Sequence, residues 1–318
     1  MKTPKFWAER NFTAQILRPL GELYAFATKT KIRFGKPHSA NIPVLCVGNL
    51  TAGGTGKTPV AISLMKIMRK KYKRPMFVSR GYGGKLKNIM VDRQENTYEQ
   101  VGDEPLLLSR HAPTIINPNR YNAALLAQDE GADAIVMDDG FQNQSLAKDL
   151  SFLVFDGQAG IGNGFCVPAG PMREKFEDGL ERADAVIILG EDKHNLRLKI
   201  SGIPVFYGKT VPLTKPDFQK NVIAFAGIGR PQKLYDTLLA LGADLIATRD
   251  FPDHHKYKEQ ELLDLIDFAK NTNSDLYTTT KDYVKIPYHL RGEFKVVEIG
   301  IKWQDEDKLC EFICSRLF

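Results

Sequence analysis

The 318-residue chain has few cysteines and no long apolar stretch. Its four cysteines are scattered, and the only close pair, Cys310 and Cys314, lies in an amphipathic segment without a nearby histidine. We therefore expect reduced thiols in a cytosolic setting, not a disulfide framework or a zinc site. No apolar run reaches the roughly 20 residues of a membrane-spanning helix, because the longest uncharged run, residues 37–56, is interrupted by Ser, Asn, Thr and Gly. No compact apolar core precedes a small-residue cleavage site, so a cleaved secretory signal is not expected.

A basic surface typical of nucleic-acid binding is also missing from most of the chain. Lys and Arg number 44 and Asp and Glu 38, which gives a net charge of +6. Residues 1–36 hold eight of the basic and two of the acidic residues, so they account for the whole excess. The other 282 residues are balanced. We expect no nucleic-acid partner, and any electrostatic partner should be sought at this N-terminal arm, residues 1–36.

The N-terminal arm has the pattern of one or two amphipathic helices. Apolar residues recur at spacings of three and four, namely Phe12, Ile16, Leu20, Leu23 and Ala27. Pro19 is expected to kink the helix or to begin a second one. Two interpretations remain open: a helix whose apolar face enters a bilayer while Lys and Arg hold anionic headgroups, or an amphipathic helix packed on the body.

From residue 42 onward, short apolar strands alternate with helices. Strands are expected at 42–47, 75–79, 114–116, 134–137, 151–155 and 185–189. Helices are expected at 59–70, 104–109 and 121–130. This alternation predicts an α/β fold with a parallel sheet covered by helices on both faces. Such sheets bind ligands beyond the carboxyl ends of their strands.

The length allows one large domain or two modest ones, because single cores stop growing at roughly 250–300 residues. Residues 201–221 contain prolines and lack clear periodicity, which indicates a boundary region. Beyond it, a strand at 222–225 and a helix at 232–241 begin a second, smaller α/β unit. We therefore expect the N-terminal arm at 1–36, a nucleotide-binding domain at 37–205 and a smaller α/β domain at 206–318. The smaller domain is expected to close the cleft between the two domains.

A glycine-rich loop lies between the first strand and the first helix of the nucleotide-binding domain. Its glycines let backbone N–H groups approach a polyphosphate, Lys57 can reach the β- and γ-phosphates, and Thr58 can bind Mg²⁺. The usual motif begins with glycine, whereas this loop begins with Thr51. An incidental glycine-rich turn is the alternative, which the flanking strand and helix disfavour. The loop in this context predicts that the α/β fold is of the P-loop NTPase type. The nucleotide-binding candidates in this loop are Thr51, Ala52, Gly53, Gly54, Thr55, Gly56, Lys57 and Thr58.

Two acidic residues, Asp138 and Asp139, follow the apolar strand at 134–137. An acidic residue at the carboxyl end of a neighbouring strand lies beside the phosphate loop, where it can hold Mg²⁺ or its waters. Taken alone, the pair is also compatible with an ordinary strand end. Phosphoryl transfer further needs a base for the attacking hydroxyl. Asp103 at a helix start is more often a cap, and His254 more often a loop residue, so these residues alone do not identify the base.

Six ordered motifs resemble those of the tetraacyldisaccharide 4′-kinase family, the lipid A kinases of Gram-negative bacteria. They span about residues 42–257, and Thr51 in place of the first glycine belongs to this family's form of the loop. The motifs are G-N-L-T-A-G-G-T-G-K-T-P at 48–59, S-R-G-Y-G at 79–83, V-G-D-E-P at 101–105, D-D-G-F-Q at 138–142, G-N-G at 162–164 with P-A-G-P-M-R-E at 168–174, and F-P-D-H-H at 251–255.

The resemblance implies a lipid kinase that transfers the γ-phosphate of ATP, with Mg²⁺, to the 4′-hydroxyl of a tetraacylated glucosamine disaccharide 1-phosphate. It implies a peripheral enzyme on the cytoplasmic face of the bacterial inner membrane, and no obligate protein partner is evident. It implies that Asp103 is the base, assisted by His254 in preference to His255. It further places Gln142 at the nucleotide, and Asp138, Asp139, Arg173 and Glu174 at the phosphates and metal, with Lys57 and Arg173 among the catalytic residues.

Two rival functions remain from the residues. One is a membrane-surface P-loop ATPase or GTPase that uses hydrolysis to change conformation. The other is a membrane scaffold that binds nucleotide only for stability. A lipid phosphorylation assay separates both from the kinase.

Overall fold

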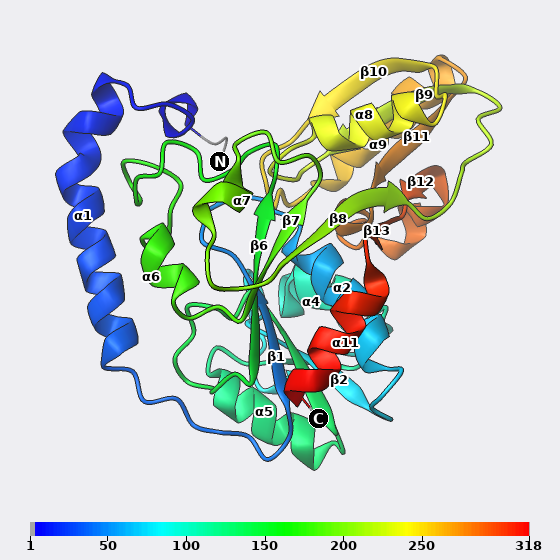
Figure 1. Ribbon diagram of the computed structural model, residues 1–318. Helices are drawn as coiled ribbons and strands as arrows, with labels where there is room; N and C mark the ends of the chain where they lie inside the picture. Colours follow the sequence, from blue (N-terminus) through cyan, green and yellow to red (C-terminus); the bar gives the residue numbers. More distant parts are fainter. Residues whose placement is uncertain (1–3, 318) are drawn as a thin grey trace.

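The structure is a computed structural model that describes residues 4–317 and contains two β-sheets (Figure 1). The larger sheet has nine strands, and all but its two edge strands run parallel. In spatial order its strands are β13 (Ile299–Trp303), β8 (Val205–Pro212), β7 (Ala185–Leu189), β6 (Leu150–Asp156), β1 (Val44–Gly48), β5 (Ala134–Asp138), β2 (Pro75–Ser79), β4 (Thr114–Ile116) and β3 (Ile89–Met90).

Helices cover both faces of this sheet, which explains why its central strands are continuously apolar. Leu45 and Val47 of β1 pack with α2 (Lys57–Met68) and α11 (Glu306–Leu317). The alternate residue Cys46 packs on the opposite face with α5 (Arg120–Asp129). Every residue of β1, β2, β5, β6 and β7 is buried. The predicted parallel sheet with two covered faces is confirmed.

Shorter helices surround the large sheet and connect its strands. They are η1 (Lys5–Trp7), α3 (Tyr98–Val101), α4 (Asp103–Leu108), α6 (Phe176–Leu180) and α7 (Leu196–Lys199). Helix α4 follows α3 directly and begins near the carboxyl end of β2, so its first residues lie on the ligand-binding side of the sheet.

The smaller sheet is wholly parallel and forms a second unit above the first in Figure 1. Its strands are, in spatial order, β10 (Leu245–Asp250), β9 (Asn221–Ala226), β11 (Ser274–Thr279) and β12 (Phe294–Val297). Its helices are α8 (Gln232–Ala240), α9 (Glu259–Asn271), α10 (Thr280–Tyr283) and η2 (Tyr288–Glu293). Two separate apolar clusters, one on each face of the sheet, form its core.

The predicted extent of the second unit, 206–318, is wrong at both ends. The supposed boundary segment contains β8, and β13 returns to pair with β8 in the large sheet. Helix α11 then packs on the first unit, where Leu309 and Ile313 join the same apolar cluster as Phe152. Trp303 anchors this return by donating a hydrogen bond from Nε1 to Ser63 Oγ at 2.9 Å. Strand and helix patterns do not show which of two sheets a strand joins, so this return could not be predicted from them.

Helix α1 (Phe12–Arg33) is one continuous helix of 22 residues, although Pro19 lies inside it. Pro19 therefore does not begin a second helix, which was one of its two expected effects. Pro19 is exposed, so the carbonyl that loses its helical partner can be hydrated. Residues 1–3 of the expected arm lie outside the described residues. In Figure 1 the helix runs along one side of the first unit.

Small residues form the inner face of α1, and large apolar residues form its outer face. Ala14, Gly21 and Ala25 are buried, and a Cβ at Gly21 would lie 2.7 Å from the carbonyl oxygen of Cys166. Ion pairs of 2.6 Å from Lys29 to Asp178 and 2.7 Å from Lys175 to Glu22 attach the helix to the body. The outer face of α1 consists of Phe12, Ile16, Leu20, Leu23 and Phe26, which are 54–81% exposed.

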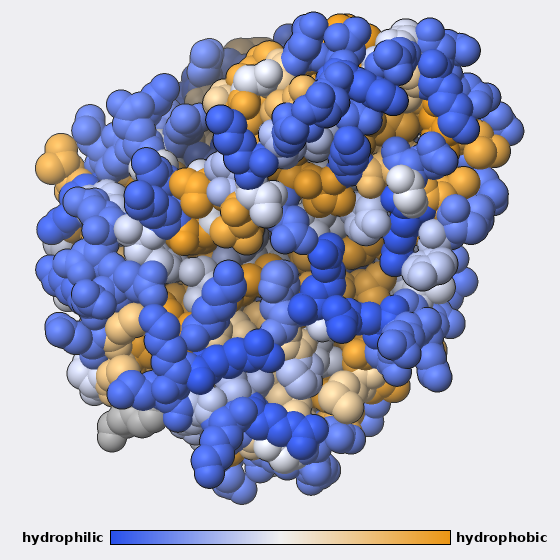
Figure 2. Space-filling model, turned by 90° about the vertical axis from the view of Figure 1, so that its right-hand side faces the viewer, coloured by the Kyte–Doolittle hydropathy of each residue, from blue (hydrophilic) through white to orange (hydrophobic). Residues whose placement is uncertain are grey.

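The outer face of α1 is unusual for this molecule. The side of the protein away from α1 is dominated by hydrophilic side chains with apolar ones scattered among them (Figure 2).

Among residues 4–317, no helix is both long enough and apolar enough to cross a bilayer. All four cysteines are unpaired.

Candidate active site

The loop between β1 and α2 has the backbone geometry of a phosphate cradle. Gly56 caps α2 with a φ of +88°, and a Cβ there would lie 2.5 Å from Leu189 Cδ1, so only glycine fits. At Gly53 and Gly54, by contrast, a Cβ would meet no atom within 4 Å. The backbone at these two glycines is therefore open to a ligand, at the N-terminus of a 12-residue helix.

Asn49 holds this loop in place through side-chain hydrogen bonds. It is fully buried, and its Nδ2 donates to the Thr51 carbonyl at 2.7 Å and to Thr55 Oγ1 at 3.0 Å. Its Oδ1 accepts a hydrogen bond from Lys57 Nζ at 3.2 Å. Sequence reasoning did not assign Asn49 a role, although a polar residue directly after an apolar strand was the available signal.

Asp138 lies at the end of β5 and is 1% exposed. Thr58 Oγ1 donates to its Oδ2 at 3.0 Å, whereas its Oδ1 has no hydrogen-bond partner among residues 4–317. Burial, together with the nearby Glu104 and Asp139 carboxylates, raises the pKa of Asp138 to about 7. A buried carboxylate oxygen without a partner beside a threonine hydroxyl fits Mg²⁺, which takes one or two protein oxygens and completes its shell with phosphates and water.

Asp139 forms ion pairs with two cations of the site. It lies 2.9 Å from Arg173 Nη1 and 3.6 Å from Lys57 Nζ. Burial alone would raise the pKa of Asp139, but Lys57 and Arg173 hold it below its ordinary value. Its φ of +49° is uncommon for a residue other than glycine and turns the chain sharply after β5. The structure thus brings the two predicted phosphate-binding cations to one carboxylate.

Gln142 and Glu174 belong to the same network. Gln142 Nε2 donates to the Asn49 carbonyl and to Glu174 Oε1, both at 2.9 Å. Glu174 is 2% exposed and also pairs with Arg182. Both predicted residues therefore lie next to the phosphate loop, and the Glu174 carboxylate already has two partners.

A second cluster of functional candidates lies where the two units meet. Asp103 is the first residue of α4 and is 5% exposed. His254, in the loop after β10, directs its Nδ1 at Asp103, 2.9 Å from Oδ2 and 3.2 Å from Oδ1. The ring of Tyr82 packs edge-on against the His254 ring with centroids 5.5 Å apart. The structure therefore joins three of the sequence motifs in one place.

The charge states of this pair depend on each other. Burial would raise the pKa of Asp103, but the His254 hydrogen bond and the Lys281 cation hold it below its ordinary value. The Asp103 hydrogen bond raises the pKa of His254, against the opposing effects of burial and Lys281. His255 is placed differently, because its Nε2 lies 2.9 Å from Glu261 and its ring stacks on Phe251. Of the two histidines, His254 is the one that contacts Asp103.

The second unit also lies directly over the phosphate loop. A Cβ at Gly229, in the loop between β9 and α8, would lie 3.3 Å from the Gly54 nitrogen. Asp156 at the end of β6 is 2% exposed and pairs with Arg230 at 2.7 Å and with Lys233 at 2.5 Å. The nucleotide region and the Asp103–His254 pair are therefore covered by the same unit.

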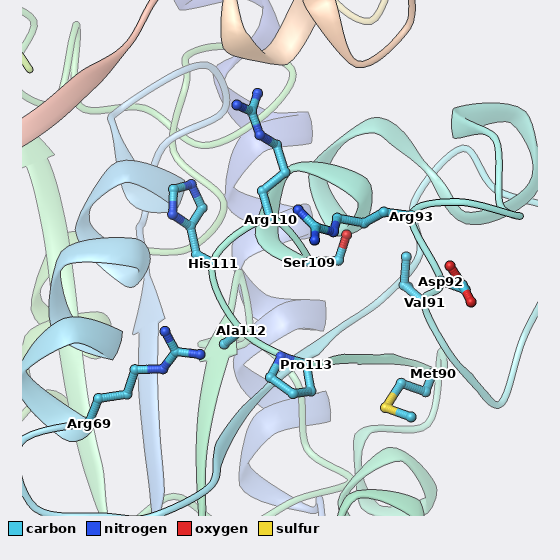
Figure 3. Close-up of a pocket in the computed structure, with 10 residues that line it drawn as sticks. All are labelled: Arg69, Met90, Val91, Asp92, Arg93, Ser109, Arg110, His111, Ala112 and Pro113. Atoms are coloured by element: carbon cyan, nitrogen blue, oxygen red, sulfur yellow. The ribbon is translucent and has the colours of Figure 1, made fainter. Parts of the chain in front are cut away.

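A separate cavity of about 630 Å³ lies elsewhere (Figure 3). Arg69, Arg93, Arg110 and His111 line it. Arg69 follows the end of α2, and Arg110 and His111 lie just before the start of β4. The cavity is therefore at the amino ends of the parallel strands, whereas the phosphate loop is at their carboxyl ends. It contains none of the residues assigned to phosphoryl transfer.

Comparison with known proteins agrees with this geometry. The family model for tetraacyldisaccharide-1-P 4′-kinase matches residues 13–317. The tetraacyldisaccharide 4′-kinase of Rhodospirillum rubrum is 43% identical over 100% of this chain and 98% of its own length. That of Parvibaculum lavamentivorans is 46% identical over 91% of this chain and 87% of its own length. A crystal structure of LpxK from Aquifex aeolicus in complex with ATP superposes with a TM-score of 0.79 and 26% identity, covering 96% of this chain and 99% of that one.

Proposed function

This chain belongs to the tetraacyldisaccharide 4′-kinase family and is an ATP-dependent lipid A 4′-kinase, and from this premise we propose that Asp103, assisted by His254, is its catalytic base. The observation that carries the proposal is the contact between these two side chains across the two units, beside a covered phosphate loop. Closure of one unit over the other excludes water, which limits wasteful hydrolysis of ATP.

In the proposed reaction the 4′-hydroxyl oxygen of the acceptor attacks the γ-phosphorus of ATP. The new oxygen–phosphorus bond forms as the bond to the β–γ bridging oxygen breaks, and ADP leaves with that electron pair. The hydroxyl proton passes to the Asp103 carboxylate. His254 donates a hydrogen bond to the same carboxylate and orients it.

The phosphate loop, residues 51–58, is proposed to bind the triphosphate together with Gln142. Lys57 and Arg173 both lie against Oδ1 of Asp139, where they can neutralise the transferring group. Thr58 and Asp138 would hold Mg²⁺, and Asp139 and Glu174 are the further candidate ligands. When bound, Mg²⁺ supplies charge neutralisation at the phosphates.

The outer face of α1 is proposed to bind the cytoplasmic surface of the bacterial inner membrane. A tetraacylated glucosamine disaccharide 1-phosphate carries its acyl chains in a bilayer, so its kinase must work at the bilayer surface. The exposed apolar side chains supply an insertion face, and the exposed Lys31, Arg33 and Lys36 follow at its end. Each basic residue near an anionic leaflet contributes about 1 kcal/mol.

The experiment that tests the function is phosphorylation of the disaccharide lipid in vesicles with Mg-ATP and the full-length protein. We expect phosphate to appear on the lipid and little ADP to form without acceptor. ATP hydrolysis without acceptor, combined with no lipid product, would contradict the kinase and favour a P-loop ATPase. Parallel reactions with GTP test the choice of nucleotide.

A further inference from the structure

Lys281 extends from the second unit into the contact between the two units. It belongs to α10, and only 20% of its side-chain surface is exposed. Its Nζ lies 3.3 Å from Glu104, 3.7 Å from Asp253 and 3.9 Å from Asp103. The same Nζ lies 3.3 Å from His254 Nε2. The Lys281 ammonium thus lies against both Asp103 and His254. It also lies against the carboxylates next to them in the chain, Glu104 and Asp253.

The backbone that carries Lys281 is firmly anchored. The neighbouring Asp282 is fully buried, and its carboxylate accepts hydrogen bonds from the Gly227 N–H, the Tyr257 hydroxyl and the Thr279 hydroxyl at 2.7–3.0 Å. Lys285 pairs with the same carboxylate at 2.7 Å. These bonds tie α10 to the loop after β9, so the position of Lys281 is set by the core of the second unit.

We propose that Lys281 is a positioning residue for the catalytic base, whose ammonium aligns His254 with Asp103 across the two units and keeps the Asp103 carboxylate charged. The inference rests on the proposed function of Asp103 and His254. It adds to them a cation that sequence reasoning did not identify.

The hydrogen bonds around His254 support this role. An ammonium group only donates hydrogen bonds, so His254 Nε2 can accept from Lys281 only when that nitrogen carries no proton. The proton of the neutral ring then lies on Nδ1, which faces Asp103. Lys281 therefore selects the tautomer in which His254 donates to Asp103 and orients its carboxylate.

The charges around Asp103 support the second part of the role. The charged groups that act on Asp103 are His254 from the loop after β10, Lys281 from α10 and Lys285 just after α10, with Tyr98 of α3 nearby. Glu104 of α4 and Asp253 of the loop after β10 lie against Lys281. Without Lys281, burial of Asp103 is opposed only by the His254 hydrogen bond and charge and by Lys285. The pKa of Asp103 should then rise, and the pKa of His254 should rise as well, because Lys281 opposes protonation of that ring.

The test compares Lys281→Met with Lys281→Arg and with Lys256→Met in the full-length enzyme, using Mg-ATP and the disaccharide lipid in vesicles. Lys256 is an exposed residue two positions after His254, so its variant controls for the loss of one positive charge. For Lys281→Met we expect kcat to fall about 10- to 100-fold, with the KM for ATP changed less than about threefold. The acidic limb of the kcat–pH profile should move to higher pH by about 1 unit. Lys281→Arg should restore part of both, and Lys256→Met should match the wild type.

A wild-type kcat in Lys281→Met, or a lower kcat with an unmoved acidic limb, would overturn the inference. Should Lys281→Met not fold, nitrogen NMR of the wild-type imidazoles, with His254→Gln for assignment, tests the tautomer directly. We expect an unprotonated Nε2, and a protonated Nε2 in the neutral ring would overturn the inference. A wild-type enzyme that fails to phosphorylate the lipid contradicts the proposed function instead. An active wild type together with an inactive Asp103→Asn variant would support the proposed function independently of Lys281. The result for Lys281→Met then tests the role of Lys281 alone.

Discussion

The phosphate-loop region and the Asp103–His254–Lys281 cluster are built in opposite ways. Around the loop, Asn49, Lys57, Thr58 and Asp138 all come from the first unit, and their contacts are made within one sheet edge. The cluster joins α4 of the first unit to the β10–α9 loop and α10 of the second. The phosphate site is therefore complete within the first unit, whereas the base site exists only when the two units meet.

This difference predicts that the two regions affect nucleotide binding and turnover differently. Variants in the loop region should weaken nucleotide binding as well as turnover, because they touch the phosphates in every state. Variants in the cluster should weaken turnover alone, because their partners act on the transferring group. The predictions below test this separation.

The largest effect is expected for Asp103→Asn, which keeps the shape of the side chain but removes the base. We expect kcat to fall about 10²- to 10⁴-fold while ATP binding stays within a few-fold of the wild type. Steady-state kinetics and equilibrium ATP binding provide the two readouts. An unchanged turnover number would contradict the assignment of Asp103, and a parallel loss of ATP binding would break the proposed separation.

A somewhat smaller loss of turnover is expected for Lys57→Met, combined with weaker ATP binding. Lys57 contacts Asn49 and Asp139 beneath the phosphate loop. We expect kcat to fall about 10²- to 10³-fold, because one preorganised cation at the transferring phosphate is lost. The KM for ATP should rise at the same time. Lys66→Met, an exposed position on the same helix, is the matched control.

A moderate effect is expected for Asp156→Asn, which removes the carboxylate between the two units. Arg230 and Lys233 are 39% and 48% exposed, so water screens their attraction to Asp156 and moderates the loss. We expect the KM for ATP to rise about 3- to 10-fold, since these pairs hold the second unit over the loop. Glu191→Gln, at a carboxylate 76% exposed nearby, should leave both kinetic constants unchanged. An unaltered KM in Asp156→Asn would show that the pairs do not support closure.

The smallest effect on turnover is expected for a triple variant of the outer face of α1, Phe12→Gln, Ile16→Gln and Leu23→Gln. Binding to anionic vesicles should fall more than about tenfold, because each inserted side chain contributes about 1.5–3 kcal/mol when fully buried. Activity on detergent-dispersed acceptor should stay near the wild type. Leu198→Gln, Leu213→Gln and Tyr288→Gln change three exposed apolar residues elsewhere and serve as the control. Vesicle binding at full strength in the α1 variant would assign the membrane contact to another surface.

The two regions also differ in what could be predicted. The strands at 75–79, 114–116 and 185–189 were predicted with the bounds that the structure has, because buried parallel strands are continuous apolar runs. The phosphate loop was predicted from glycines, lysine and threonine within eight residues. Asp103 and His254 lie 151 residues apart, and only the family resemblance pointed to both. Asn49 had one signal, its place directly after an apolar strand, whereas nothing in the sequence set Lys281 apart from many other polar residues.

By itself, the sequence determined the alternation of strands and helices, the phosphate loop and the apolar stripe of α1, because these depend on residues close together in the chain. Only the tertiary structure decided that Ile299–Leu317 returns to the first unit, that the small side of α1 faces inward, and that one lysine meets Asp103 and His254. These outcomes depend on which surfaces fit together: Gly21 alone allows close approach to the Cys166 carbonyl, and periodicity is the same whichever face turns toward the body.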